Sequence, residues 1–256
     1  MNETPVLQVK DLGIDFGGLT AVNRFNITVK KHQIVGLIGP NGAGKTTVFN
    51  MLTKVYDPSR GTIELNGHQI NKLSTVEVNK AGIARTFQNI RLFSNLSVID
   101  NVLVGMHNSI NYNTSEGILR NRKFREQEKE AYQKAIELLS IFKLQDLKDH
   151  LASSLPYGAQ RRLEICRALA TNPSLLLLDE PAAGMNPSET AELMNTIKDI
   201  RDHFDIAILL IEHDMKFVMG ICEEITVLNY GTTLAFGAPE DIQNNPEVIK
   251  AYLGGV

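Results

Sequence analysis

The stretch that decides the fold is Gly39-Pro40-Asn41-Gly42-Ala43-Gly44-Lys45-Thr46, which reads G-x-x-x-x-G-K-T. An apolar run, Ile34 to Ile38, precedes it, and a helix-prone stretch starts at Lys45. Strand, glycine-rich loop and helix in this order predict a phosphate-binding loop, because glycine admits an anion close to the backbone and helix-start amides face it. Lys45 would supply charge for the β and γ phosphates, and the Thr46 hydroxyl could ligate Mg²⁺.

The composition narrows the possible function classes. The chain has 256 residues, of which 43% are hydrophobic, enough to bury a core. A net charge of −3 and a pI of about 6.1 argue against a nucleic-acid binder, which usually has a basic surface. Cys166 and Cys222 are the two cysteines, so we expect a reducing compartment rather than a disulfide framework. No apolar run approaches the roughly 18 residues of a membrane helix, and we see no signal peptide, so a membrane role would need a partner.

The order of segments predicts an α/β fold. Short β-rich runs open the chain, the first at residues 6–9, and Asn66-Gly67 is typical of a hairpin turn. The middle of the chain is polar and helical, and beyond it apolar strands alternate with amphipathic helices, which favours a parallel sheet. We expect a nucleotide-binding core over residues 1–88 and 160–256, with a helical insertion over residues 89–159.

Two carboxylates follow one apolar strand. Leu175 to Leu178 would form a buried strand that delivers Asp179 to its C-terminal edge, where Mg²⁺ would be bound. Glu180 comes next, where it could polarise an attacking water. The alternative is a buried strand that ends in two solvated carboxylates.

Three further signals are weak when each is taken alone. Gln88 carries an amide that could bond a metal-bound water and sense the γ-phosphate. Gly158 and the helix that follows it could form a second anion site, or an ordinary loop-to-helix turn. A lone histidine is more often structural, but His213 follows the apolar run 206–211, and this placement at the sheet edge favours a role near the γ-phosphate.

The order and spacing of these features resemble the ATP-binding-cassette ATPase family over essentially the whole chain. The resemblance implies a P-loop NTPase fold with a mixed, largely parallel sheet core, an N-terminal antiparallel β part and an inserted helical subdomain that ends in the family's signature segment. In this family two cassettes close face to face around two ATP molecules. Each ATP is held by the phosphate loop of one chain and the signature segment of the other, and hydrolysis reopens the dimer and drives a membrane partner.

The resemblance also assigns roles to individual residues. Those implied to bind ATP are Phe16, Gly39, Pro40, Asn41, Gly42, Ala43, Gly44, Lys45, Thr46, Thr47, Tyr157, Gly158 and Gln160. Those implied to hold Mg²⁺ are Thr46, Gln88 and Asp179. Those implied in the chemistry are Glu180 as catalytic carboxylate, His213 as switch histidine and Gln88. Phe16 would stack on adenine, with a core position as the open alternative.

The signature segment departs from the family pattern Leu-Ser-Gly-Gly-Gln. Pro156 replaces the serine, Tyr157 the first glycine and Ala159 the glutamine, and Asn186 stands where aspartate is frequent. The missing hydroxyl removes one γ-phosphate hydrogen bond, worth about 0.5–3 kcal/mol. How strongly this signature segment supports hydrolysis is therefore left open.

Within the family, the chain most resembles the ATP-binding subunits of branched-chain amino-acid importers, the LIV-G type. The segments behind this are 16–23, 85–93, 179–187, 244–254 and the long insertion near 108–125. The resemblance implies a site on the cytoplasmic face of the inner membrane, with two transmembrane permease subunits and a second, different ATPase subunit, or a homodimer in isolation. It also implies a periplasmic amino-acid-binding protein, import of leucine, isoleucine and valine, and no nucleic acid.

Residues 89–101 are our candidate docking groove for permease helices, with a locally packed loop as the alternative. The apolar residues in this loop-like stretch are Ile90, Leu92, Phe93 and Leu96. Four basic residues could meet lipid headgroups or form a solvated helix face: Arg120, Arg122, Lys123 and Arg125.

Three rival functions remain. One is the ATPase of a lipopolysaccharide-export complex, and another is a soluble cassette ATPase that acts on DNA or ribosomes. The third is a nucleotide-binding regulator without hydrolysis, against which Glu180 and His213 argue.

Overall fold

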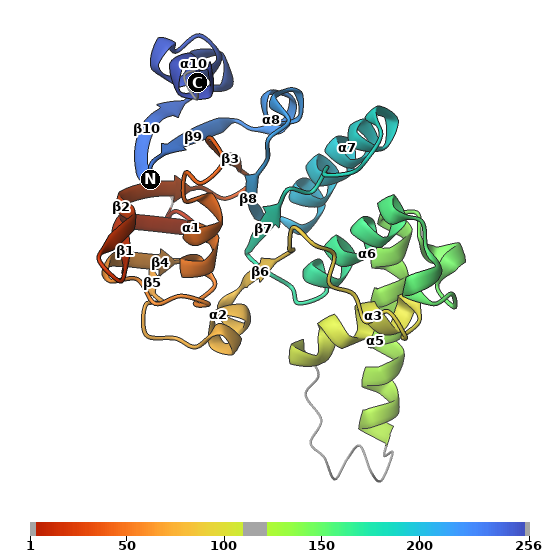
Figure 1. Ribbon diagram of the computed structural model, residues 1–256. Helices are drawn as coiled ribbons and strands as arrows, with labels where there is room; N and C mark the ends of the chain where they lie inside the picture. Colours follow the sequence, from red (N-terminus) through yellow and green to blue (C-terminus); the bar gives the residue numbers. More distant parts are fainter. Residues whose placement is uncertain (1–3, 110–121, 254–256) are drawn as a thin grey trace. The chain divides into compact units, whose positions relative to one another are not determined.

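The glycine-rich stretch lies between β3 (Ile34–Ile38) and α1 (Lys45–Leu52) in a computed structural model that describes residues 4–109 and 122–253 (Figure 1). Every residue of β3 is buried, because parallel strands flank it on both sides. The chain divides into two compact units, residues 1–88 with 174–256, and residues 89–173. Most of the insertion expected near 108–125, Arg120 included, lies outside the described residues.

A six-stranded sheet organises the first unit, in the order β10-β9-β3-β8-β7-β6. Its other strands are β6 (Ile83–Arg85), β7 (Leu175–Asp179), β8 (Ala207–Ile211), β9 (Glu224–Asn229) and β10 (Thr232–Gly237). All neighbours pair in parallel except β9 with β10. The C-terminal ends of β3, β7 and β8 therefore meet at one edge of the sheet, and so do the loops that follow them.

A second, antiparallel sheet has four strands in the order β2-β1-β4-β5. Its strands are β1 (Leu7–Phe16), β2 (Leu19–Val29), β4 (Arg60–Leu65) and β5 (His68–Gln69). β1 extends well beyond the predicted run 6–9, and its pairing with β2 contains register shifts between Val9 and Leu12, Leu12 and Ile14, and Ile14 and Asp15. The predicted Asn66-Gly67 hairpin is confirmed, with left-handed φ values of 50° and 78° between β4 and β5.

One hydrophobic core joins both sheets to α1. It contains Val48, Phe49, Met51 and Leu52 of α1 together with strand residues from both sheets. The remaining helices of this unit are α2 (Thr75–Ala81), α7 (Pro187–Phe204), α8 (Met215–Ile221), α9 (Pro239–Gln243) and α10 (Pro246–Leu253). Asn186 begins α7 as an N-cap that accepts hydrogen bonds from two backbone amides, which gives this departure from the family pattern a structural role.

The second unit is helical. Its helices are α3 (Val98–Gly105), α5 (Arg122–Ile141), α6 (Tyr157–Leu169) and the short 3-10 helices η1 (Met106–Ser109), η2 (Gln145–Leu147) and η3 (Ala152–Ser154). A side chain on Gly105 would come within 2.5 Å of the Arg167 carbonyl, so α3 and α6 approach closely. This packing places residues 160–173 with the helical unit, and corrects the boundary expected at residue 159.

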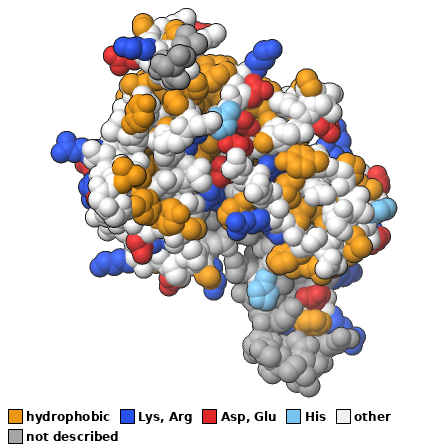
Figure 2. Space-filling view, viewed as in Figure 1, with side chains coloured by type: hydrophobic (Ala, Val, Ile, Leu, Met, Phe, Trp, Pro, Cys, Tyr) orange, Lys and Arg blue, Asp and Glu red, His pale blue; other side chains and the backbone are white. Residues whose placement is uncertain are grey.

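Several large apolar side chains reach the surface, as the face in Figure 2 illustrates. Those of the helical unit include Phe93, Leu96, Val104 and Leu151. None of the helices in residues 4–109 and 122–253 is both long enough and apolar enough to cross a membrane.

Candidate functional site

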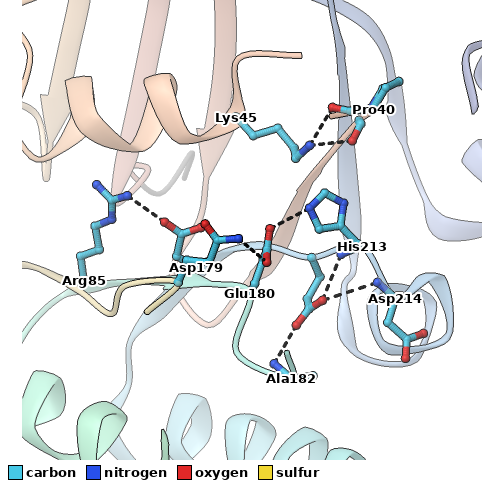
Figure 3. Close-up of polar contacts among 11 residues, drawn as sticks. Pro40, Lys45, Arg85, Asp179, Glu180, Ala182, His213 and Asp214 are labelled. Atoms are coloured by element: carbon cyan, nitrogen blue, oxygen red, sulfur yellow. Dashed lines mark hydrogen bonds and ion pairs between the residues drawn. The ribbon is translucent and has the colours of Figure 1, made fainter. Parts of the chain in front are cut away.

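The loop between β3 and α1 folds around the ammonium group of Lys45. Lys45 Nζ donates to the carbonyls of Gly39 at 2.6 Å and Pro40 at 2.9 Å, as Figure 3 shows. Only 6% of Lys45 is exposed, and burial lowers the pKa of this lysine against the opposing effect of Glu180 and Asp179. A Cβ at Gly39 would lie 2.0 Å from the Leu228 carbonyl, so the loop requires glycine there.

The first turn of α1 is free to receive an anion. Its N-cap is Gly44, which has no side chain to cap the helix amides, and the turn contains no acidic residue. The helix dipole and these amides favour negative charge at this end. A buried cation beside them completes an environment that fits a nucleotide phosphate.

Asp179, at the end of β7, forms a buried ion pair with Arg85. Arg85 Nη2 lies 2.7 Å from Asp179 Oδ2, and the two side chains are 6% and 4% exposed. Arg85 also donates to Asn50 Oδ1 of α1 at 2.7 Å and lies over the rings of Phe49 and Phe87. The arginine therefore connects β6, β7 and α1 beneath the loop.

Glu180 is contacted at both carboxylate oxygens by two other predicted site residues. Gln88 Nε2 donates to Glu180 Oε2 at 3.0 Å, and His213 Nε2 lies 2.7 Å from Glu180 Oε1 (Figure 3). Glu180 has a φ of 48°, a left-handed conformation that is rare for a residue with a side chain. The chain turns directly after β7, where the Ala183 amide donates to the Glu180 carbonyl at 3.2 Å.

A third carboxylate, Glu212, lies behind this pair. It is 4% exposed and directly follows β8. Glu212 Oε1 accepts from the Ala182 amide at 2.7 Å, and Oε2 accepts from the His213 amide at 3.0 Å and the Asp214 amide at 3.5 Å. Burial raises the pKa of Glu212, and these three backbone hydrogen bonds oppose the rise.

Phe16 lies at the end of β1, with 43% of its surface exposed. Its ring meets that of Tyr56 edge-on, with centroids 5.3 Å apart and an interplanar angle of 76°. An exposed aromatic ring held by a second one is suited to stacking. The alternative that Phe16 is a core residue is wrong, because core side chains in this unit are buried.

The signature segment begins α6 in the helical unit. Pro156 is the N-cap of α6 and provides no side-chain cap, and the first turn has no acidic residue. Tyr157 is exposed, Gly158 is buried, and Gln160 turns back so that its Nε2 donates to the Leu155 carbonyl at 2.8 Å. This second helix start also attracts anions, but without a lysine.

The structure thus brings most of the predicted residues to one edge of the first unit. They are Gly39 to Thr47 in the loop and α1, Gln88 after β6, Asp179 and Glu180 after β7, and His213 after β8. Tyr157, Gly158 and Gln160 belong to the other unit. Sequence reasoning missed Glu212 and the ion pair of Arg85. The only signal was a charged residue beside an apolar strand, which does not reveal its partner.

Metal ligands were expected at Thr46, Gln88 and Asp179. Within the described ranges, no cluster of three or more histidine, cysteine, aspartate or glutamate side chains is arranged to hold a metal ion. Mg²⁺ in nucleotide sites usually depends on one or two carboxylates with phosphates and water, so one aspartate at the end of β7 and one threonine hydroxyl in α1 fit this chemistry.

Comparison with known proteins agrees with this geometry. The family model for ABC transporters matches residues 22–183, and a model for branched-chain amino acid ATP-binding cassette transporters matches residues 232–256. The high-affinity branched-chain amino acid transport ATP-binding protein LivG of Escherichia coli K12 is 50% identical over 250 residues, 98% of each chain. The lipopolysaccharide export system ATP-binding protein LptB of Haemophilus influenzae is 32% identical over 249 residues, 97% of each chain.

A solved structure has the same fold. The ADP conformation of MJ1267, an ATP-binding cassette of an ABC transporter, superposes with a TM-score of 0.85 at 27% identity and covers 98% of this chain and 99% of its own. The predicted α/β cassette fold is thereby confirmed. Together with the family match over residues 22–183, this assigns the chain to the ABC transporter family of ATP-binding proteins.

Proposed function

We propose that this chain is the ATP-hydrolysing subunit of a membrane importer for branched-chain amino acids. The observation that carries the proposal is the 50% identity, along 98% of both chains, to a relative named for that transport. The C-terminal match over residues 232–256 supports the same solute class. Leucine, isoleucine and valine would be recognised by partner subunits, so their identity is a proposal from relatives and not from the chemistry of this site.

ATP would bind with its phosphates on the loop 39–44 and the first turn of α1. Lys45 is buried and donates to two carbonyls of its own loop, and it would exchange part of this contact for phosphate oxygens. Phe16 would stack on the adenine. Mg²⁺ would be held by Asp179 with Thr46 and Gln88, and it would neutralise charge on the phosphates.

Glu180 is the group that would direct the attacking water. Its carboxylate would orient the water and accept its proton as the bond between the γ and β phosphates breaks. His213 and Gln88 contact the two oxygens of Glu180, so they would hold the carboxylate and respond to the γ-phosphate. The exposed histidine ring could then pass from Glu180 to the phosphate without leaving the sheet edge.

A second ATPase subunit would complete the site. The start of α6 has uncapped amides and no acidic residue, which suits contact with a γ-phosphate already held by another chain. ATP would stabilise the paired state because only that state contacts the γ-phosphate from two sides. We infer a heterodimer in the importer, with a homodimer as the alternative in isolation.

The permease subunits would dock on residues 89–101 of the helical unit, at the cytoplasmic face of the inner membrane. Phe93 is 47% and Leu96 37% exposed there. The segment is firmly held, because Asn101 Oδ1 accepts from the Phe93 amide at 2.9 Å and Glu164 Oε1 from the Arg91 amide at 3.0 Å. A rigid loop with exposed apolar side chains suits a partner helix.

The test is to purify the chain with its partners from gently solubilised membranes. We expect two multi-span permeases and a second cassette ATPase, identified by mass spectrometry. Proteoliposomes of that complex should take up radiolabelled leucine when ATP and a periplasmic amino-acid-binding protein are supplied. Recovery of soluble partners only, or of a complex that moves none of the three amino acids, would contradict the proposal.

The second candidate is an ATPase of lipopolysaccharide export. The observation in its favour is the 32% identity to the Haemophilus influenzae relative. That similarity is well below the 50% found for the amino-acid relative over the same span of chain. Lipid-export permeases in the purified complex would favour this candidate instead.

A further inference from the structure

Glu212 is a buried carboxylate with no part in the chemistry described above. It is one of the few charged side chains buried in the first unit, at 4% exposure. Its two oxygens accept from backbone amides on two different segments, Ala182 after β7 and His213 with Asp214 after β8. The dashed lines to Ala182, His213 and Asp214 in Figure 3 mark these bonds.

Glu212 joins the segment after β7, which contains Glu180, to the segment after β8, which contains His213, and these two residues contact each other. Glu180 precedes Ala182 by two residues, and Glu180 Oε1 lies 2.7 Å from His213 Nε2. The turn contains a strained residue, since Glu180 has a φ of 48°. A strained turn keeps its conformation only where surrounding contacts over-determine it.

We infer that Glu212 is a positioning residue, which holds the turn 180–183 against the segment of His213 so that Glu180 and His213 keep their relative geometry. This rests on the proposed function of Glu180 and His213. Glu212 touches neither the water nor the phosphates, and acts through its neighbours.

The residue type at this position matters for a physical reason. A carboxylate is acceptor-only, so both of its oxygens can face backbone N–H groups at once. A glutamine of the same size offers one oxygen and one NH₂, and the NH₂ would face an amide donor. An aspartate keeps both acceptors but is one methylene shorter, so it cannot reach both segments.

The experiment compares Glu212→Gln and Glu212→Asp with wild type in the full chain, alone and in its purified complex. We expect kcat for ATP hydrolysis to fall about ten- to hundredfold in each variant. ATP affinity, measured with the additional substitution Glu180→Gln to prevent turnover, should change less than about twofold because the phosphate loop is untouched. Glu240→Gln, an exposed acid on α9 of the same unit, is the matched control and should leave kcat unchanged.

A second readout separates positioning from general destabilisation. The ring resonances of His213, assigned with the His213→Gln spectrum, should move in both Glu212 variants at temperatures where the fold is intact. If Glu212→Gln does not fold, Glu212→Asp decides by the same measurements.

Two results would overturn the inference. One is wild-type kcat in both variants, and the other is a loss of kcat with unmoved His213 resonances or with an equal loss of ATP affinity. A wild-type chain that hydrolyses no ATP in its complex would instead remove the proposed function, so the two failures are distinguishable.

Discussion

The N-termini of α1 and α6 both present uncapped amides that favour an anion, but they differ in the side chains beside those amides. Neither has a side-chain cap or an acidic residue in its first turn. α1 begins with a buried lysine, whose ammonium lies beneath a glycine loop. α6 begins with Pro156 and the exposed Tyr157, and its Arg161 is fully buried in a pair with Glu164 at 2.9 Å.

This difference indicates which of the two helix N-termini can bind a nucleotide without a partner chain. A helix end with a fixed, desolvated cation can bind phosphate strongly, because the charge is already in place and poorly hydrated. A helix end with amides only contributes the weaker attraction of the helix dipole, roughly 0.3–1 kcal/mol per charge. We therefore expect ATP affinity to come from the first unit, and the start of α6 to act on a phosphate that another chain has bound.

The largest effect should follow from Glu180→Gln, which tests ATP hydrolysis beside the N-terminus of α1 while leaving the ATP-binding residues unchanged. The amide cannot accept the proton of the attacking water, so kcat should fall by about 10²–10⁴-fold. ATP affinity should stay near that of wild type, and a nucleotide-bound dimer should accumulate, which light scattering can detect. Unchanged turnover would remove Glu180 from the mechanism.

Arg85→Met tests the buried ion pair with Asp179, which links β6 and β7 near α1. It leaves Asp179 buried without its cation, and breaking such a pair costs about 3–5 kcal/mol. Denaturant unfolding of the isolated chain should show this loss. Arg60→Met is the control, because its pair with Asp15 is exposed and should matter far less. Equal losses of unfolding free energy in Arg85→Met and Arg60→Met would show that the buried pair stabilises the fold no more than the exposed one.

Phe93→Asp tests the proposed permease-docking surface of the helical unit, residues 89–101, rather than the N-terminus of α6. A charge in place of an exposed aromatic anchor should weaken assembly with the permeases by about 30-fold, equivalent to about 2 kcal/mol. ATP binding by the isolated chain should be unchanged. Val104→Asp, at a similarly exposed position on α3, is the control. Normal assembly and transport by Phe93→Asp would place the docking surface elsewhere.

The smallest effect should come from Pro156→Ser, which restores the hydroxyl at the start of α6. A serine N-cap stabilises a helix by about 0.5–2 kcal/mol, and its hydroxyl could also reach a γ-phosphate. We expect ATP turnover of the complex to stay equal or rise by up to about threefold. A large fall in a steady-state ATPase assay would show that the proline is itself required.

Sequence reasoning reached the phosphate loop and the order of strands and helices, because each depends on spacing along a short segment. It also named Gln88, Glu180 and His213 as site residues, but not the contacts that join them. It did not reach Glu212 or the partner of Arg85. Those contacts join residues that are distant in sequence, and a charge beside an apolar strand is consistent with either burial or exposure. The boundary at residue 173 was missed for a similar reason, since the close approach of Gly105 to α6 is a tertiary contact.

The most direct test of the difference between the two helix ends is the ATP affinity of the isolated chain. It should be measured by equilibrium dialysis in a Glu180→Gln background, with Lys45→Ala and Tyr157→Asp added separately. Asp is favourable in the first turn of a helix, so Tyr157→Asp should fold while repelling phosphate. We predict that Lys45→Ala weakens ATP binding by at least about 30-fold and that Tyr157→Asp leaves it unchanged. Equal losses in both variants would contradict the account, because the start of α6 would then hold the nucleotide of its own chain.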